Sequence, residues 1–350
     1  MSGGVDSSVS AALLKQQGFD VTGVFIKTWQ PDWLECNWKE DRRDAMRVAA
    51  TLGIPFLTLD LEREYKQEVA DYMVSEYKVG RTPNPDVMCN KQVKFGAFLQ
   101  FARKSGADFI ATGHYARIQK RNATYSLLTG NDANKDQSYF LWTLTQEALS
   151  HTLFPVGEYQ KSEVRTIAED FNLPTAQKKD SQGVCFLGKL DMSEFLSHYI
   201  EQKQGDVLNE KGEVVGHHNG ALLYTNGQRH GFTVTSKGIE DKPRYVVDRD
   251  IQKNTITVTK KKTLEQHFTT RTVVISDTNW IGTKTIDPAK IYSARFRYRQ
   301  QLESCTIKQT SDTTTTIHFT TDQTAVSAGQ SMVLYDGEIC LGGGTIEKTE

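Results

Sequence analysis

The pattern of helical and extended segments changes near residue 204 of this 350-residue chain. Before that point, apolar segments with a helical period alternate with short segments rich in β-branched residues. Such alternation predicts a doubly wound parallel sheet with helices on both faces. Beyond it, short Thr- and Val-rich segments with turn residues between them predict small β-barrels. The expected fold is therefore an α/β domain over 1–203, a small central β domain over 204–264 and a C-terminal β-barrel domain over 265–350.

The periodicity also places individual elements. Helices are expected at 7–17, 41–52, 62–78, 91–104, 137–149 and 161–171, and strands of the first domain at 21–26, 55–59 and 109–112. Strands of the second half are expected at 245–247, 255–259, 271–276, 294–298, 313–319 and 331–335, with hairpin turns at 210–212 and 226–227.

Composition excludes several classes of protein. No apolar run approaches the ~20 residues that span a bilayer, and the first residues lack the basic and apolar regions of a signal peptide, so a cytoplasmic location is expected. The five cysteines are odd in number, scattered and without a C-x-x-C pair, which argues against a disulfide scaffold, a zinc ribbon or an iron–sulfur cluster. They are Cys36, Cys89, Cys185, Cys305 and Cys340.

Charge is distributed unevenly although the net charge is only −1. Residues 91–121 hold seven basic side chains and one acid, whereas residues 32–76 hold eleven acids and six bases. A near-neutral protein can thus present a basic face to a nucleic acid. Without other evidence, however, such a cluster of basic side chains is more typical of a solvated helix surface.

The string Ser2-Gly3-Gly4-Val5-Asp6-Ser7-Ser8 runs directly into the first expected helix. The two glycines allow backbone N–H groups to approach a phosphate closely, and the helix N-terminus adds partial positive charge. Ser7 and Ser8 can add hydroxyl donors. Asp6 fits a phosphate-binding loop only if it holds Mg²⁺ or orients the loop. The alternative is a Gly-rich arm with a serine N-cap.

This string resembles the pyrophosphate loop (PP-loop) of ATP pyrophosphatases, which split ATP into AMP and pyrophosphate. Further segments resemble, in order, motifs of the tRNA 2-thiouridylases of bacteria and mitochondria. These are RTPNPDVMCN at 81–90, GHYAR at 113–117, KDQSYFL at 135–141, DSQGVCF at 180–186, GQR at 227–229, RYRQ at 297–300 and GQ at 329–330. The resemblance covers essentially the whole chain.

The resemblance implies ATP-dependent 2-thiolation of the wobble uridine, residue 34 of tRNA. Uridine O2 would be adenylated, and sulfur from a cysteine persulfide would then replace it, giving 2-thiouridine, AMP and pyrophosphate. ATP and Mg²⁺ are implied, without a metal-ligand set in the protein itself. A tRNA and a sulfur-donor protein, either a persulfide relay or a cysteine desulfurase, are the implied partners. We expect a monomer.

The family's site residues carry over to matching positions. ATP is expected to contact Met1, Ser2, Gly3, Gly4, Val5, Asp6, Ser7, Ile26 and Gly113. The tRNA and its target base are expected to contact Asn84, Pro85, Asp86, His114, Lys135, Asp136, Gln137, Arg297, Tyr298 and Gln330.

Two cysteines are expected to carry the chemistry. Cys89 precedes a helix expected near Lys91, and the helix N-terminus with nearby lysines should lower the pKa of its thiol. An ordinary buried thiol is the alternative. Asp86 is a candidate for accepting a proton or orienting the base, and it is equally a candidate N-cap. The apolar neighbours of Cys185 indicate a core residue, but the resemblance implies that Cys185 carries the persulfide. Cys89 would then resolve this persulfide by thiol–disulfide exchange.

The remaining three cysteines are interpreted as structural. Arg295, Arg297 and Arg299 would share one face of an expected strand, which suits RNA phosphates, with Tyr298 stacking from the other face or the strand end. A strand edge blunted by charge is the alternative.

The chain departs from the family at its start. Family members carry a hydrophobic strand before the phosphate loop, and Met1 here falls within the motif. We therefore expect the native chain to begin upstream, because a sheet without that strand has an empty central position and a weakened ATP site. Two other functions stay open: an ammonia-using PP-loop synthetase, and a catalytically silent tRNA-binding homologue.

Overall fold

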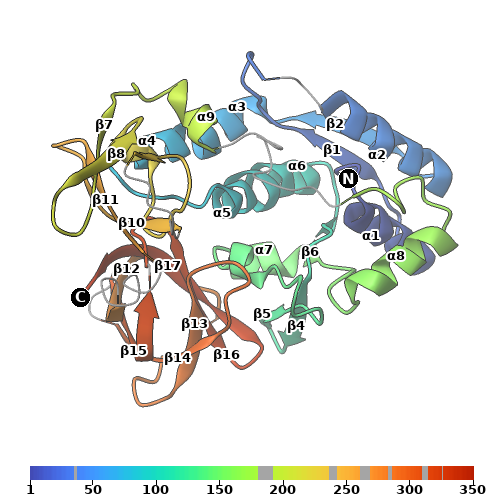
Figure 1. The fold of residues 1–350 in the computed structure, drawn as a ribbon. Coiled ribbons are helices and arrows are strands. Elements are labelled where there is room, and N and C mark those ends of the chain that lie inside the picture. Colours follow the sequence, from blue (N-terminus) through green and yellow to red (C-terminus); the bar gives the residue numbers. More distant parts are fainter. Residues whose placement is uncertain are drawn as a thin grey trace.

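The computed structural model describes residues 1–34, 38–179, 192–235, 243–260, 269–282, 286–309, 314–324 and 326–350. An α/β region comes first in the chain, and two β-rich modules follow it (Figure 1). This arrangement confirms the predicted fold class. None of the helices within these ranges is long and apolar enough to cross a membrane.

The α/β region consists of short parallel strands with helices around them. Its helices are α1 (Val5–Gln16), α2 (Trp38–Leu52), α3 (Glu62–Tyr65), α4 (Tyr72–Lys78), α5 (Pro85–Met88), α6 (Leu99–Lys104), α7 (Gln146–Ser150), α8 (Lys161–Asp170) and α9 (Met192–Ser197). π-Helical segments Lys66–Asp71 and Cys89–Phe98 connect α3 to α4 and α5 to α6, so each set forms one continuous helix.

Two parallel strand pairs occur in this region. β1 (Gly23–Lys27) pairs with β2 (Phe56–Asp60), and β3 (Ile110–Ala111) pairs with β6 (Thr152–Leu153). The α-amino group of Met1 donates to the carbonyl of Val24 in β1. The expected strand ahead of Met1 remains a prediction.

Helices α1 and α8 pack against each other through small and β-branched side chains. Val5 and Val9 of α1 share one buried cluster with Val164 and Ala168 of α8. The start of α8 is fixed by a capping box in which the Gln160 backbone N–H donates to Glu163. The packing and the cap therefore fix the position of the N-terminal end of α8 relative to that of α1.

The central module is a five-stranded sheet of order β10-β11-β7-β8-β9. Its strands are β7 (Gly205–Leu208), β8 (Val214–His218), β9 (Thr233–Val234), β10 (Arg244–Asp250) and β11 (Thr255–Lys260). Val207 and Ile256 of this sheet pack in one core with Tyr77 of α4 and Phe195 of α9. The sheet therefore rests directly on helices of the α/β region.

The C-terminal module is a closed six-stranded barrel of order β12-β15-β14-β13-β16-β17, in which β12 also pairs with β17. Its strands are β12 (Thr269–Trp280), β13 (Tyr292–Arg295), β14 (Glu303–Gln309), β15 (Thr315–Thr324), β16 (Ser331–Asp336) and β17 (Ile339–Thr349). Gly342 permits the closure, because a Cβ there would lie 1.9 Å from the carbonyl oxygen of Asn279.

A hairpin that the sequence analysis missed joins the barrel to the α/β region. β4 (Ala116–Arg121) and β5 (Thr124–Thr129) form it, and β5 pairs with β17 at Leu128 and Ile339. The barrel sheet thus crosses the domain boundary expected near residue 203.

Three expected elements were wrong in extent. The helix expected at 91–104 begins at Pro85 instead. The helix expected at 137–149 is a 3-10 turn (Ser138–Leu141) and the separate short helix α7. The strand expected at 294–298 ends at Arg295.

Candidate active site

The glycine-rich loop at residues 2–4 folds tightly against the start of α1. Gly3 has φ of +75°, and a Cβ there would lie 2.3 Å from the Asp41 carbonyl oxygen, so only glycine fits. The Ser2 backbone N–H donates to Ser7 Oγ at 3.1 Å. Ser8, expected as a phosphate donor, is instead buried and donates to the Gly4 carbonyl at 2.8 Å. The loop is therefore a compact turn held by its own hydrogen bonds at the start of α1.

Gly113 brings a second segment onto this loop. A Cβ at Gly113 would lie 2.7 Å from the backbone nitrogen of Ser7, so the chain after β3 can approach α1 only with glycine here. Ile26 lies in β1, two residues beyond the Val24 carbonyl that Met1 contacts. The residues expected to bind ATP thus come from α1, β1 and the end of β3, which supports the expected site without testing it.

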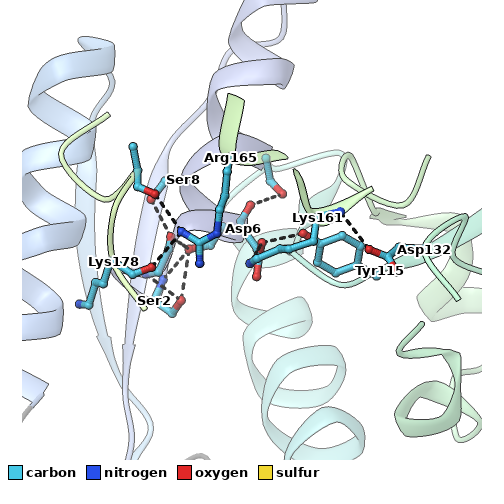
Figure 2. Close-up of polar contacts among 12 residues, drawn as sticks. Ser2, Asp6, Ser8, Tyr115, Asp132, Lys161, Arg165 and Lys178 are labelled. Carbon is cyan, nitrogen blue, oxygen red and sulfur yellow. Dashed lines mark hydrogen bonds and ion pairs between the residues drawn. The ribbon is translucent and has the colours of Figure 1, made fainter. Parts of the chain in front are cut away.

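Cations from α8 and the segment after it surround the loop (Figure 2). Lys161 Nζ lies 2.6 Å from Asp6 Oδ1, and the Tyr115 hydroxyl donates to the same oxygen at 2.8 Å. Arg165 Nη1 donates to the carbonyls of Ala176 and Lys178 at 2.9 and 3.2 Å. No local motif marks these basic residues, so sequence reasoning missed them.

Lys178 connects the same segment to α2. Its ammonium lies 2.8 Å from both Asp41 Oδ1 and Asp44 Oδ2. Burial lowers the pKa of Lys178, but the hydrogen bonds that its ammonium donates to the two carboxylates, with their negative charges, outweigh burial and raise the pKa above its ordinary value. The segment that ends at Lys178 is therefore tied to α2, whose Asp41 carbonyl lies against Gly3 of the glycine-rich loop.

The helix that carries Cys89 begins earlier than expected. Asn84 is its N-cap, since the Asn84 side chain accepts from the Val87 backbone N–H at 3.3 Å. Asp86 is therefore not the N-cap but a first-turn residue, and Cys89 is the fifth helical residue, with 2% of its surface exposed. The expectation that Cys89 precedes the helix was wrong, because the helix starts at the second of two closely spaced prolines.

The other cysteines divide into two groups. Cys185 and Cys36 lie outside the described residues, so the expected pairing of Cys89 with Cys185 stays a prediction. Cys305 and Cys340 are buried in the cores around the barrel, and burial raises the pKa of each thiol to about 12. Such thiols are inert, in agreement with the structural interpretation.

The barrel supports the segment that leads into Asn84 and the first turn of α5. The Gln330 side-chain amide donates to the Thr82 carbonyl at 2.8 Å and to the Pro83 carbonyl at 3.3 Å. Gly329 permits this approach, because a Cβ there would lie 2.8 Å from the Thr82 nitrogen. In the structure Gln330 thus contacts the protein backbone, and its expected contact with tRNA remains a prediction.

His114 is an interior histidine. Only 8% of its surface is exposed, Nδ1 lies 2.8 Å from the Thr112 hydroxyl, and the rings of Phe95 and Phe154 are both 5.9 Å away. Burial, with a smaller contribution from Lys94, holds the pKa of His114 well below its ordinary value. The imidazole is therefore neutral at pH 7 and can act as a hydrogen-bonding group.

This burial predicts a pH-dependent stability. Below the ordinary histidine value of 6.5, the unfolded chain takes up a proton at His114 while the folded chain does not, so stability falls as the pH falls through that window. We expect the melting temperature of the wild type to drop between about pH 7 and about pH 5, and His114→Gln to make that drop smaller. An equal drop in both proteins would contradict the prediction.

Asp136 and Gln137 lie within the protein framework. Asp136 is 5% exposed, forms an ion pair with the buried Arg295, and accepts from the backbone N–H groups of Gly130 and Ser138 at 3.0 and 3.1 Å. Gln137 Oε1 accepts from the Tyr115 backbone N–H at 3.0 Å. Lys135 is half-buried. These contacts indicate positioning roles for Asp136 and Gln137, and contact with the base stays untested.

The arginine cluster is arranged differently from the expectation. Arg295, the last residue of β13, points into the core, whereas Arg297 and Arg299 follow the strand and are exposed, so the three do not share one strand face. Tyr298 packs on Phe140, with ring centroids 4.7 Å apart. A hollow of about 490 Å³ is lined by Phe296, Arg297, Tyr298, Arg299, Gln300, Glu303 and residues 321–324.

Comparison with known proteins agrees with this architecture. Three family models match consecutive parts of the chain: the tRNA methyl transferase HUP domain at 1–189, the tRNA methyl transferase PRC-barrel domain at 193–260 and the aminomethyltransferase beta-barrel domain at 270–346. They correspond to the α/β region, the five-stranded sheet and the closed barrel.

Curated relatives match over nearly the full length. The tRNA-specific 2-thiouridylase MnmA of Alkaliphilus oremlandii is 46% identical over 350 residues, covering 99% of this chain and 96% of the relative. The proteins of the same name from Stutzerimonas stutzeri and Bacillus subtilis are 46% and 44% identical, covering 100% and 99% of this chain and 94% and 93% of the relatives. With three matched domains and this identity over nearly the full length, the chain belongs to the tRNA-specific 2-thiouridylase family.

Proposed function

We propose that this protein is a tRNA-uridine 2-sulfurtransferase that converts the wobble uridine to 2-thiouridine with ATP. The observation that carries the proposal is full-length similarity to enzymes named for tRNA 2-thiolation, at about 45% identity. The loop at the start of α1 and the thiol of Cys89 supply, within one α/β region, two of the groups that such a reaction uses.

The reaction begins at the uridine O2. This oxygen attacks the α-phosphorus of ATP, pyrophosphate leaves, and C2 now carries AMP as a leaving group. The compact loop 2–4 and the first turn of α1 offer backbone N–H groups for the departing pyrophosphate. Asp86, half-buried in the first turn of the helix that carries Cys89, accepts the proton from the base or orients it.

Sulfur transfer then uses two thiols. The terminal sulfur of a Cys185 persulfide attacks C2 and AMP departs with the original oxygen; Cys89 then attacks Cys185 Sγ, which releases 2-thiouridine and leaves a Cys89–Cys185 disulfide. Alternatively, Cys89 attacks first and the released hydrosulfide attacks C2. Both orders consume one persulfide sulfur and end in the same disulfide, which a dithiol must reduce before the next cycle.

Mg²⁺ is not assigned a protein site. Asp6, the carboxylate considered for it, already has Oδ1 bonded to Lys161 and Tyr115, and the described ranges hold no group of three His, Cys, Asp or Glu side chains that could bind a metal. We therefore assign Asp6 to orienting the loop. A magnesium ion would arrive with the triphosphate and neutralise its charge.

The tRNA would lie across exposed and half-buried basic side chains. Lys135, the arginine-rich hollow with Arg297 and Tyr298, and the basic segment 91–121 offer phosphate contacts and one aromatic ring for stacking. His114, neutral and next to the loop that contains Gly113, would act as a hydrogen-bonding group toward the base. A persulfide relay or cysteine desulfurase as donor, a monomeric state and a cytoplasmic location belong to the same proposal.

A reconstituted assay tests the function. The protein is incubated with uridine-34-containing tRNA, MgATP, a persulfide donor and a dithiol, and digested tRNA is examined for 2-thiouridine by mass spectrometry. We expect 2-thiouridine, with AMP and pyrophosphate in equal amounts, and no product when an ATP analogue with a non-cleavable α,β-bridge replaces ATP. Binding of tRNA without AMP release would instead favour the silent homologue, and ATP-dependent incorporation of ammonia would favour the synthetase.

A further inference from the structure

The phosphate-binding end of α1 carries a negative charge of its own. Asp6 is in the first turn of this 12-residue helix, where partial positive charge from the backbone attracts anions. A carboxylate at this position stabilises the helix, but it competes with a phosphate for the N–H groups of the helix N-terminus. It also repels a triphosphate placed within a few ångströms. A loop that accepts ATP must therefore neutralise Asp6.

Lys161 provides the opposite charge. Its ammonium lies 2.6 Å from Asp6 Oδ1, and the Lys161 and Asp6 side chains are 13% and 32% exposed, so the pair is partly shielded from water. The Lys161 ammonium lies 5.8 Å from the centre of the Tyr115 ring, and the Tyr115 hydroxyl donates to the same Asp6 oxygen (Figure 2). Asp6 is thus fixed by a cation and by a hydroxyl at once.

The backbone of Lys161 is itself held in place. Its N–H donates to Asp132 Oδ2 at 2.9 Å, and Gln160 and Glu163 cap the same helix start. Helix α8 packs on α1 through Val164 and Ala168. The ammonium therefore reaches Asp6 from a rigid element, so little reorganisation is needed when a nucleotide binds.

We propose that Lys161 is a positioning residue for ATP, which neutralises and fixes Asp6 so that the loop amides can receive the triphosphate. Lys161 acts through Asp6 and not by contact with the phosphates. The inference rests on the proposed ATP-dependent function and names a further residue for it, from outside the motifs that identified the loop.

Equilibrium binding of labelled ATP with Mg²⁺ tests the proposal. We expect Lys161→Met, which keeps the alkyl chain over Tyr115, to weaken ATP binding about tenfold or more, because it leaves the Asp6 carboxylate without a counter-charge beside the phosphates. Lys161→Arg should bind nearly as the wild type does. The control is Lys66→Met, since Lys66 forms an exposed 3.0 Å pair with Asp71 within another helix of the α/β region, and ATP affinity should not change.

The double variant separates neutralisation from direct contact. Asp6→Asn combined with Lys161→Met should restore ATP affinity to within about threefold of the wild type, because the repelling charge is gone. Asp6→Asn alone should bind ATP at least as tightly as the wild type, which tests the idea even if Lys161→Met does not fold. In steady-state thiolation, Lys161→Met should raise the KM for ATP and leave kcat at saturating ATP nearly unchanged.

Three results would overturn the proposal. Unchanged ATP affinity in Lys161→Met would show that Asp6 needs no neutralisation. A double variant as weak as Lys161→Met would show that Lys161 does not act through Asp6, and weakened binding in Asp6→Asn alone would show that the charge of Asp6 does not oppose ATP binding. A wild type that binds no ATP would overturn the proposed function together with this inference, whereas the first two results leave the proposed function standing.

Discussion

Cys89→Ser is expected to reduce 2-thiouridine formation by at least about a hundredfold while ATP and tRNA still bind. Serine keeps the size of the side chain but cannot form a disulfide or attack a persulfide at a useful rate. Because Cys89 is 2% exposed, its replacement also places a hydroxyl in the core, which costs about 1–3 kcal/mol if that group lacks a partner. The assay therefore belongs at a temperature well below the melting temperature of both proteins.

The matched control is Cys340→Ser, which places the same hydroxyl at another buried thiol. This variant should show a comparable loss of stability and keep thiolation. Mass spectrometry of the protein adds a second readout: Cys89→Ser should still gain one sulfur atom from the donor, whereas Cys185→Ser should not. Full thiolation by Cys89→Ser would remove Cys89 from the mechanism.

Local sequence patterns correctly predicted the elements whose conformation depends on residues within the same segment. The helix expected at 161–171 agrees closely with α8, and strands expected at 255–259 and 331–335 match β11 and β16. Each of these segments has a clear apolar period and a start or stop signal within a few residues. The glycine-rich loop was also readable, because its conformation depends on Gly3 itself.

The elements and contacts that were not predicted depend on partners that are far away in the sequence. The β4 strand has a polar outer half, and the hairpin gains its place only by pairing β5 with β17, more than two hundred residues later. Asp136 and Arg295, and likewise Asp6 and Lys161, are more than 150 positions apart in sequence. Nothing local distinguishes Arg295, which is buried, from Arg297, which is exposed; only the end of β13 decides between them.

The buried pair of Asp136 and Arg295 is expected to dominate the stability of the junction between the barrel and the α/β region. Asp136→Ala should lower the free energy of unfolding by about 3–5 kcal/mol, because it leaves the Arg295 guanidinium buried without a counter-charge. It also deprives the backbone N–H groups of Gly130 and Ser138 of their acceptor. Urea unfolding of the wild type and the variant measures the difference.

Tyr335 cannot replace the lost carboxylate. Its hydroxyl accepts from Arg295 Nη2 at 2.8 Å, but burial raises the pKa of Tyr335 well above its ordinary value, so the phenol stays neutral. Removing both charges in Asp136→Ala with Arg295→Met should therefore recover much of the loss. Asp71→Ala, which breaks the exposed pair with Lys66, is the control and should cost no more than about 1 kcal/mol.

The same variants distinguish the two roles open to Asp136. If Asp136 holds the framework, loss of thiolation should follow loss of folded protein, and the double variant should regain activity as it regains stability. If Asp136 contacts the target base, the double variant should be stable and inactive, with kcat reduced at saturating ATP and tRNA. The burial of Asp136 and its four hydrogen-bond donors, from Gly130, Ser138 (backbone and hydroxyl) and Arg295, favour the first outcome, since no carboxylate so engaged can turn toward a base without leaving Arg295 unpaired.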